Sequence, residues 1–168
     1  MLDSNEHVKH VLGLSGGKDS SALAIYMRDN YPELEIEYFF TDTGEELDEV
    51  YEYLNNLTGY LGKPINYLNP NKNFGYYMDQ YGNFLPSAQA RWCTVNLKLA
   101  PFEKWVDKEF ISKGMKVKSY VAIRSDEGFR EGLQSKKDIE TVLPFKEDHI
   151  DKEAVLEIEA RLNNYWID

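Results

Sequence analysis

The sequence contains a single cysteine, Cys93, among its 168 residues. One thiol cannot form a disulfide within the chain, and it cannot supply the several thiolates that an iron–sulfur cluster requires. The three histidines, His7, His10 and His149, show neither an H-x-x-x-H spacing nor a paired cysteine. We therefore expect no iron–sulfur cluster within one chain and no zinc site.

Long apolar runs are missing as well. No segment approaches the roughly eighteen apolar residues that a membrane-spanning helix needs, and the first nine residues carry charges where a secretory signal would be apolar. We therefore expect a cytoplasmic protein without a membrane partner. The sequence has no internal repeat and no linker rich in Pro, Gly or Ser, so it predicts one domain over residues 1–168.

Positive charge is scarce, because nineteen Lys and Arg oppose twenty-nine Asp and Glu and give a net charge of −10. This average charge repels phosphate backbones and argues against a general nucleic-acid coat protein. The charge is uneven, however. Residues 91–146 hold twelve basic and eight acidic side chains, whereas the rest of the chain holds seven and twenty-one.

Two periodicities alternate along the chain. Short apolar or aromatic runs indicate buried strands, and the segments between them space apolar residues by three and four, as one helix face does. The expected strands cover residues 7–14, 35–41, 64–68 and 117–123, with an extended piece at 141–145. The expected helices cover residues 18–30, 46–61, 95–111 and 151–163. Two βα units followed by a strand predict an α/β fold with a parallel, Rossmann-like sheet flanked by helices.

The connection at residues 69–87, NPNKNFGYYMDQYGNFLPS, is too long for an ordinary turn and is a candidate substrate loop. Its tyrosines Tyr76, Tyr77 and Tyr81 could stack on a nucleobase. The alternative is that these rings pack against other aromatic side chains beneath the loop.

The segment SGGKDS, residues 15–20, lies between the first expected strand and the first expected helix. Two glycines let the backbone turn tightly, so that its N–H groups can approach an oxyanion, and the helix end adds partial positive charge. Two serine hydroxyls and a lysine ammonium are further donors. The candidate cofactor-binding residues of this loop are Ser15, Gly16, Gly17, Lys18, Asp19 and Ser20.

The loop does not match two common nucleotide motifs. A Walker A pattern ending at Gly17-Lys18 would need glycine at Leu12 and Ser or Thr at Asp19. The G-x-G-x-x-G pattern of dinucleotide-binding proteins is absent too. The loop therefore favours polyphosphate binding of another type, and the alternative is a turn whose serine and aspartate only cap the helix.

SGGKDS resembles the pyrophosphate loop, or PP-loop, of the N-type ATP pyrophosphatases. Further motifs extend the resemblance to the phosphoadenosine phosphosulfate reductase family: TDTGE at 41–45, RWCT at 91–94 with Leu97, Lys98 and Pro101, and VAIRSDE at 121–127 with Arg130. The resemblance spans residues 8–146. It implies an adenine nucleotide alpha-hydrolase-like fold that binds ATP and Mg²⁺, releases pyrophosphate and adenylates an acceptor in sulfur transfer or nucleic-acid modification.

Asp42 follows the second expected strand, at the edge where open α/β sheets bind ligands. Its carboxylate and that of Asp19 are candidate ligands of a Mg²⁺ ion that bridges phosphate oxygens. The resemblance supports a nucleotide role for Asp42, and capping of the next helix is the alternative. The candidate catalytic residues are Lys18, Asp19 and Arg124.

Four cations are candidates for binding an anionic substrate: Arg91, Lys98, Arg124 and Arg130. Arginine binds phosphate or sulfate through two parallel hydrogen bonds, and lysine neutralises the charge of such an anion as a point charge. Ordinary pairing of Arg124 with Asp126 or Glu127 is the alternative.

Cys93 lies where the resemblance places paired cysteines of cluster-bearing adenylylsulfate reductases, but Thr94 occupies the second position. The thiol is a candidate sulfur carrier, as a persulfide or mixed disulfide, if Arg91 or Lys98 stabilises its thiolate. The alternative is a small buried apolar residue.

Two other functions stay open at this point. A phosphosulfate reductase would bind its substrate's phosphates in the same loop, although the family's reaction uses a cysteine near the carboxyl terminus and this sequence ends in YWID. The second is a noncatalytic nucleotide-binding subunit. The chain lacks the cysteine-bearing region that many family members carry after the last helix, so the alternatives are a minimal form, a truncated chain and one subunit of a split enzyme. A homo-oligomer is a further alternative. The expected partners are an adenine nucleotide and a nucleic acid or sulfur-donor protein.

Overall fold

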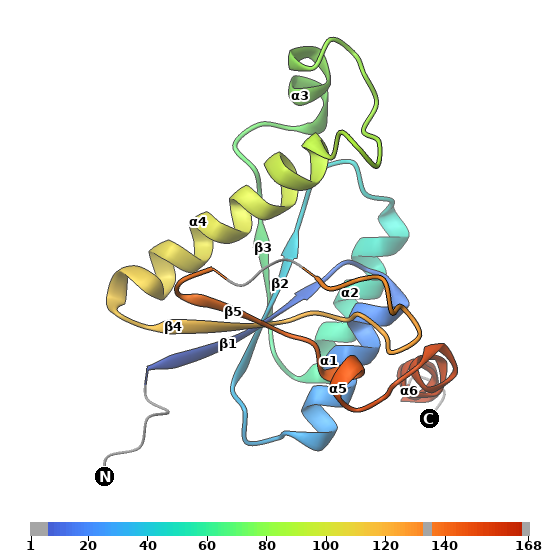
Figure 1. Ribbon diagram of the computed structural model, residues 1–168. Coiled ribbons are helices and arrows are strands. Elements are labelled where there is room, and N and C mark those ends of the chain that lie inside the picture. The colour runs from blue at the N-terminus through green and yellow to red at the C-terminus, as the bar shows by residue number, and fades with distance from the viewer. Residues whose placement is uncertain (1–6, 133–135, 166–168) are drawn as a thin grey trace.

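The computed structural model describes residues 7–132 and 136–165. Its five strands are β1 (Val8–Leu14), β2 (Ile36–Thr41), β3 (Ile65–Leu68), β4 (Lys116–Tyr120) and β5 (Ile139–Val142). They form one sheet in the order β3-β2-β1-β4-β5, in which every neighbouring pair is parallel (Figure 1). The expected parallel, Rossmann-like α/β fold is confirmed.

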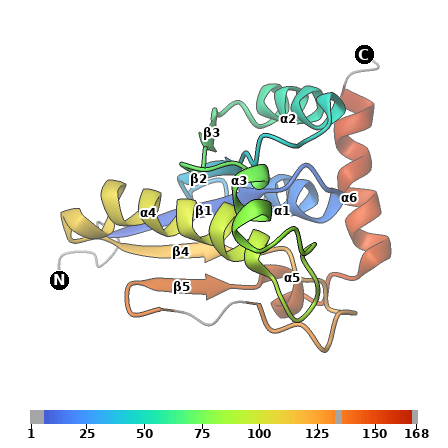
Figure 2. The same cartoon turned by 90° about the horizontal axis from the view of Figure 1, so that it is seen from above.

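The helices cover both faces of the sheet. Those described are α1 (Lys18–Asn30), α2 (Asp48–Leu61), α3 (Phe74–Gln80), the π-helix η1 (Thr94–Leu99), α4 (Ala100–Glu109), the 3₁₀-helix η2 (Ile111–Lys113), α5 (Pro144–Glu147) and α6 (Lys152–Tyr165). Figures 1 and 2 show α1, α2 and α6 on one face and α4 across the other. None of the described helices has the length and apolar character needed to span a bilayer.

Alternate side chains of β1 enter two separate cores. Leu12 and Leu14 pack in the larger core with residues of α1, α2 and α6, whereas Val11 packs with Val106 and Phe110 near α4. Because helices bury both faces, consecutive residues Val11 and Leu12 of the central strand β1 are both fully buried. Because all neighbouring strands are parallel, their carboxyl ends lie at one edge of the sheet.

The long connection after β3 contains a helix that the sequence does not predict. The Asn73 side chain caps α3 by accepting a hydrogen bond from the Tyr76 N–H at 2.9 Å. Beneath this segment, buried Trp92 stacks on Tyr81, with ring centroids 5.3 Å apart, and contacts Phe74 at 5.1 Å. Aromatic packing, the alternative considered for the tyrosines, therefore describes Tyr81.

Two prolines account for further differences from the expected elements. The helix expected at 95–111 consists of η1 followed by α4, with Pro101 in the first turn of α4. Proline has no N–H to donate, so the regular series of helical backbone hydrogen bonds is interrupted at this point. The extended piece expected at 141–145 ends as a strand at Val142, because Pro144 begins α5.

His10 on β1 makes stability depend on pH. Its Nδ1 lies 2.8 Å from the Tyr120 hydroxyl, and burial, followed by the charges of Lys118 and Lys9, lowers its pKa below 6.5. The folded protein thus binds this proton less well than the unfolded chain does. Stability contributed by neutral His10 is complete above pH 6.5 and is lost as the pH falls toward the lowered pKa.

The parent protein should lose unfolding free energy when the pH falls from about 7.5 to about 5.5. We expect the His10→Gln variant to lose less over the same range. Urea unfolding of both proteins in the same buffers measures this difference. An identical pH dependence in the variant and the parent protein would contradict the role of His10.

Candidate functional site

Three of the four motif segments meet at the carboxyl edge of the sheet. Residues 15–20 follow β1, Asp42 follows β2, and Arg124 lies shortly after β4. Since these strands are parallel neighbours, their ends lie side by side. The fourth segment, residues 91–94, precedes η1, and Figures 1 and 2 place this start of the helical stretch beside α3.

The PP-loop backbone has a conformation that depends on glycine. Gly16 adopts φ +74°, and a Cβ at this position would lie 2.6 Å from Cγ1 of Val50. Serine hydroxyls hold the turn from inside: Ser20 Oγ accepts from the Ser15 N–H at 3.1 Å, and Ser15 Oγ accepts from the Gly17 N–H at 3.3 Å. The loop is therefore a tight turn with its backbone brought close to α2.

The amino end of α1 carries no side-chain cap among the described residues. Gly17 is the capping position, and the N–H groups of the first helical turn have no carbonyl partner within the helix. Lys18 is exposed at the start of the helix and makes no ion pair with the part of the chain that the structure describes. Backbone donors, the helix dipole and a lysine together can hold an oxyanion.

Arg124 joins the PP-loop to the segment after β4. Its guanidinium donates to Asp19 at 2.9 Å and to Asp126 at 3.0 Å, and its Nη1 lies 3.1 Å from Glu127 Oε1. The hydrogen bond to Asp126 raises the pKa of Arg124 and lowers that of the Asp126 carboxyl. Arg130 pairs with the buried Glu127 at 2.7 Å. Two of the four candidate substrate cations are thus held in one carboxylate cluster.

Asp42 is half-buried and takes part in a hydrogen-bonded turn. Its Oδ1 accepts from the Gly44 N–H at 2.9 Å and from the Tyr51 hydroxyl at 2.7 Å, and this second bond raises the pKa of Tyr51 to about 12. Tyr51 is a site residue that its sequence position does not reveal, because it occupies one apolar position of the amphipathic helix α2.

Among the described residues, no group of three or more His, Cys, Asp or Glu side chains could hold a metal ion. Mg²⁺ needs only one or two carboxylates when phosphates and water supply its other oxygens. Asp42 fits that requirement, whereas Asp19 is engaged by Arg124. The Mg²⁺ assignment of both residues stays a prediction.

The remaining candidates lie just before η1 or on it, and among the described residues none of them forms an ion pair with the Arg124 cluster. Arg91 is exposed and donates to the Ala88 carbonyl at 3.3 Å, and Lys98 is exposed on η1. Cys93 is half-buried, with its Sγ 3.9 Å from Thr94 Oγ1. Of the four candidate cations, only Arg124 and Arg130 share a partner among the described residues, and the sulfur-carrier role of Cys93 stays a prediction.

A model of the phosphoadenosine phosphosulfate reductase domain matches residues 9–143. The chain belongs to this family. The family identification made from the four motifs is confirmed. No curated protein sequence matches the chain.

Two solved structures of low sequence identity share the fold of this family member. The phosphoadenylyl-sulfate reductase from Candida auris, in its phosphate complex, is 11% identical with a TM-score of 0.63, over 94% of this chain and 73% of that chain. The U34-tRNA thiolase NcsA from Methanococcus maripaludis, with its 4Fe–4S cluster, is 16% identical with a TM-score of 0.57. That alignment covers 94% of this chain and 58% of the thiolase. Both are named as enzymes of sulfur chemistry.

Proposed function

We propose that this protein is a PP-loop ATP pyrophosphatase that adenylates an acceptor in sulfur transfer or nucleic-acid modification. The observation that carries the proposal is the PP-loop itself, residues 15–20, with its glycine-dependent turn before an uncapped helix and the exposed Lys18. This arrangement suits the β- and γ-phosphates of ATP.

The reaction exchanges one bond to the α-phosphorus for another. A nucleophilic atom of the acceptor forms a bond to the α-phosphorus, and the bond from that phosphorus to the oxygen bridging to the β-phosphate breaks. The electron pair leaves with pyrophosphate, and AMP remains on the acceptor. Donors that hold the β- and γ-phosphates stabilise the negative charge that grows on this leaving group.

Each site residue has a role in this proposal. Backbone N–H groups of the PP-loop and the Lys18 ammonium bind the leaving pyrophosphate, and Arg124 fixes the loop through Asp19. Asp42 would hold Mg²⁺, which when bound offsets the charge of the phosphate oxygens. In this proposal Arg91 and Lys98 bind the anionic part of an acceptor, and Cys93 is the sulfur carrier.

A phosphosulfate reductase is the second candidate, and the fold shared with the Candida auris reductase favours it. The PP-loop would then bind the phosphates of the phosphosulfate substrate. The two candidates differ in their products, so one set of reactions distinguishes them.

We expect incubation with ATP and Mg²⁺ to yield AMP and pyrophosphate, slowly when water is the only acceptor. Chromatography of the nucleotides and an enzymatic pyrophosphate assay measure the products. ADP and phosphate would contradict the proposal, and ATP binding without turnover would support a noncatalytic subunit instead. Sulfite from phosphoadenosine phosphosulfate and a thiol reductant would establish the second candidate.

A further inference from the structure

Residues 69–93, between β3 and η1, contain α3 and stand out beyond the end of the sheet (Figure 1). We call them the α3 arm. Three of its 25 residues are charged and six are aromatic, whereas 29% of the whole chain is charged and 14% is aromatic. Few charges and many aromatic rings are the composition typical of the centre of a protein–protein interface.

The arm and the first turn of η1 carry an apolar patch. Half of the ten large apolar or aromatic side chains that are exposed in the described part of the chain belong to residues 76–95. Four of these form what we call the arm patch: Tyr81 (46% exposed), Phe84 (77%), Leu85 (71%) and Val95 (53%). The buried Trp92 connects their segments, because Tyr81 stacks on its ring and its indole N–H donates to the Phe84 carbonyl at 3.2 Å. Val95 follows Trp92 by less than one helical turn.

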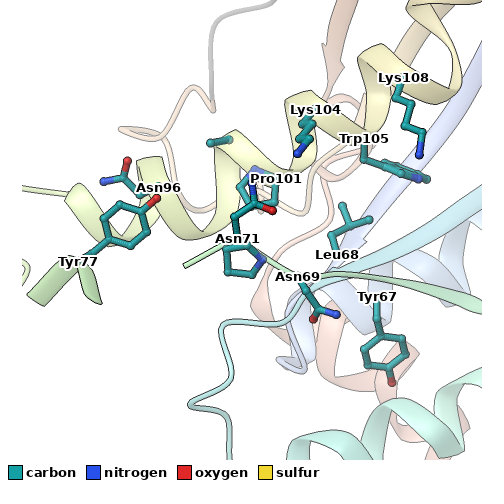
Figure 3. Close-up of a pocket in the computed structure, with 12 residues that line it drawn as sticks. Tyr67, Leu68, Asn69, Asn71, Tyr77, Asn96, Pro101, Lys104, Trp105 and Lys108 are labelled. Atoms are coloured by element: carbon teal, nitrogen blue, oxygen red, sulfur yellow. The ribbon is translucent and has the colours of Figure 1, made fainter. Parts of the chain in front are cut away.

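The arm patch lies outside the groove between the arm and α4. That groove has a volume of about 330 Å³, and Asn71 and Tyr77 line it from the arm (Figure 3). None of the four patch residues lines it. Their exposed fractions therefore describe a separate surface that is open to solvent within the described part of the chain.

The area of the patch suits one face of a stable dimer. Taking about 150–250 Å² for an aromatic side chain and somewhat less for leucine and valine, the four side chains expose roughly 400–500 Å². The largest apolar patch on a monomeric protein is usually about 300–600 Å² and is often functional. One side of a standard interface covers about 800 Å², and slightly more than half of that area is apolar. The arm patch can therefore supply the apolar area of such a face.

Two opposite charges on the arm favour a second copy of this chain as the occupant. Asp79 and Arg91 are exposed, and neither forms an ion pair with the described residues. In a two-fold symmetric dimer each contact occurs twice, with the residues exchanged. Asp79 of one copy can therefore pair with Arg91 of the other on both sides of an apolar centre. Two chains of net charge −10 repel each other elsewhere, so the nearly neutral arm is the favourable place of contact.

We propose that two copies of this chain form a symmetric dimer through the arm patch, with Phe84 and Leu85 at its centre and Asp79 paired with Arg91 across it. The proposal does not rest on the proposed function, because association needs neither ATP nor turnover. Arg91 keeps its proposed role in acceptor binding, since a guanidinium has five N–H donors and one carboxylate occupies only two of them.

The test is sedimentation equilibrium of the full chain without nucleotide. Interfaces of standard size have dissociation constants of micromolar or below, so we expect the dimer to dominate at about 100 µM and to dissociate on dilution. The variants Phe84→Ala and Leu85→Ala should each raise the dissociation constant at least about tenfold, because the loss of a side chain from the centre occurs in both copies. Leu156→Ala is the matched control, because this leucine is exposed on α6, and it should dimerise as the parent protein does.

Charge exchange tests the pairing of Asp79 with Arg91. Asp79→Arg and Arg91→Asp should each weaken the dimer at least about tenfold, because like charges then meet across the two-fold axis. The double variant Asp79→Arg, Arg91→Asp restores both opposite pairs and should recover most of the lost affinity. Urea unfolding of each variant checks that these exposed substitutions leave the fold intact.

A chain that remains monomeric at about 100 µM would overturn the second copy as the occupant of the patch. A dimer that Phe84→Ala and Leu85→Ala leave unchanged would place the interface elsewhere on the molecule and would overturn the proposal as well. A double charge variant no better than either single variant would overturn the pairing of Asp79 with Arg91. Pyrophosphate release is measured separately, so the failure of either proposal leaves the other standing.

Discussion

Replacing Lys18 by alanine should weaken ATP binding by about tenfold to a hundredfold, as expected when a charge-assisted contact of about 1.5–3 kcal/mol is lost. Lys18 is exposed in the first turn of α1. A positive charge there opposes the helix dipole, so the lysine contributes little or nothing to helix stability. The proposed contact with phosphate therefore accounts for a lysine at this position better than helix stability does.

We therefore expect Lys18→Ala to leave the free energy of unfolding within about 1 kcal/mol of the parent protein. Calorimetric titration with ATP and Mg²⁺ measures the affinity, and urea unfolding measures the stability. Lys63→Ala is the control, because this exposed lysine lies between α2 and β3, at the opposite edge of the sheet. Unchanged ATP affinity in Lys18→Ala would show that the ammonium does not contact the phosphates.

Gly16→Ala should lower the free energy of unfolding by about 2–4 kcal/mol and also weaken ATP binding. Two costs add here. The backbone has φ +74°, which a residue with a Cβ rarely adopts, and the new methyl group would lie 2.6 Å from Val50 Cγ1. Either the Val50 side chain shifts, or the loop backbone moves away from α2 and displaces the N–H groups that we propose to bind phosphate.

The variant Gly44→Ala separates the backbone strain from the steric overlap. Gly44 has φ +79°, but no atom lies within 4 Å of the position of its Cβ. It should therefore cost about 1–2 kcal/mol, from backbone strain alone. The double variant Gly16→Ala, Val50→Ala should recover part of the lost ATP affinity by removing the overlap. If Gly16→Ala were no more destabilising than Gly44→Ala, close packing of the loop against α2 would be wrong.

Most of the fold is predictable because its βα units have strong local signals. The positions of β1 to β3, α1 and α2 agree with the sequence to within two residues at each end. The sequence also begins the last helix at Asp151, and the carboxylate of this residue accepts from the Ala154 N–H at 3.0 Å, as the cap of α6 does. Helix α3 could not be predicted from periodicity, because none of its residues is buried.

The site was predictable where sequence motifs follow strands, and less so where distant residues meet. The parallel topology explains why residues 15–20, Asp42 and Arg124 share one edge. The contact between Arg124 and Asp19 joins residues 105 positions apart, and no local pattern records it.

The most direct test of the account is a crystal structure of the protein with Mg²⁺ and a nonhydrolysable ATP analogue. We expect the β- and γ-phosphates to accept hydrogen bonds from backbone N–H groups between Gly16 and Ser20, with the Lys18 ammonium within hydrogen-bonding distance of a phosphate oxygen. A triphosphate bound elsewhere, with neither Lys18 nor the N–H groups of the PP-loop in contact with it, would contradict the account.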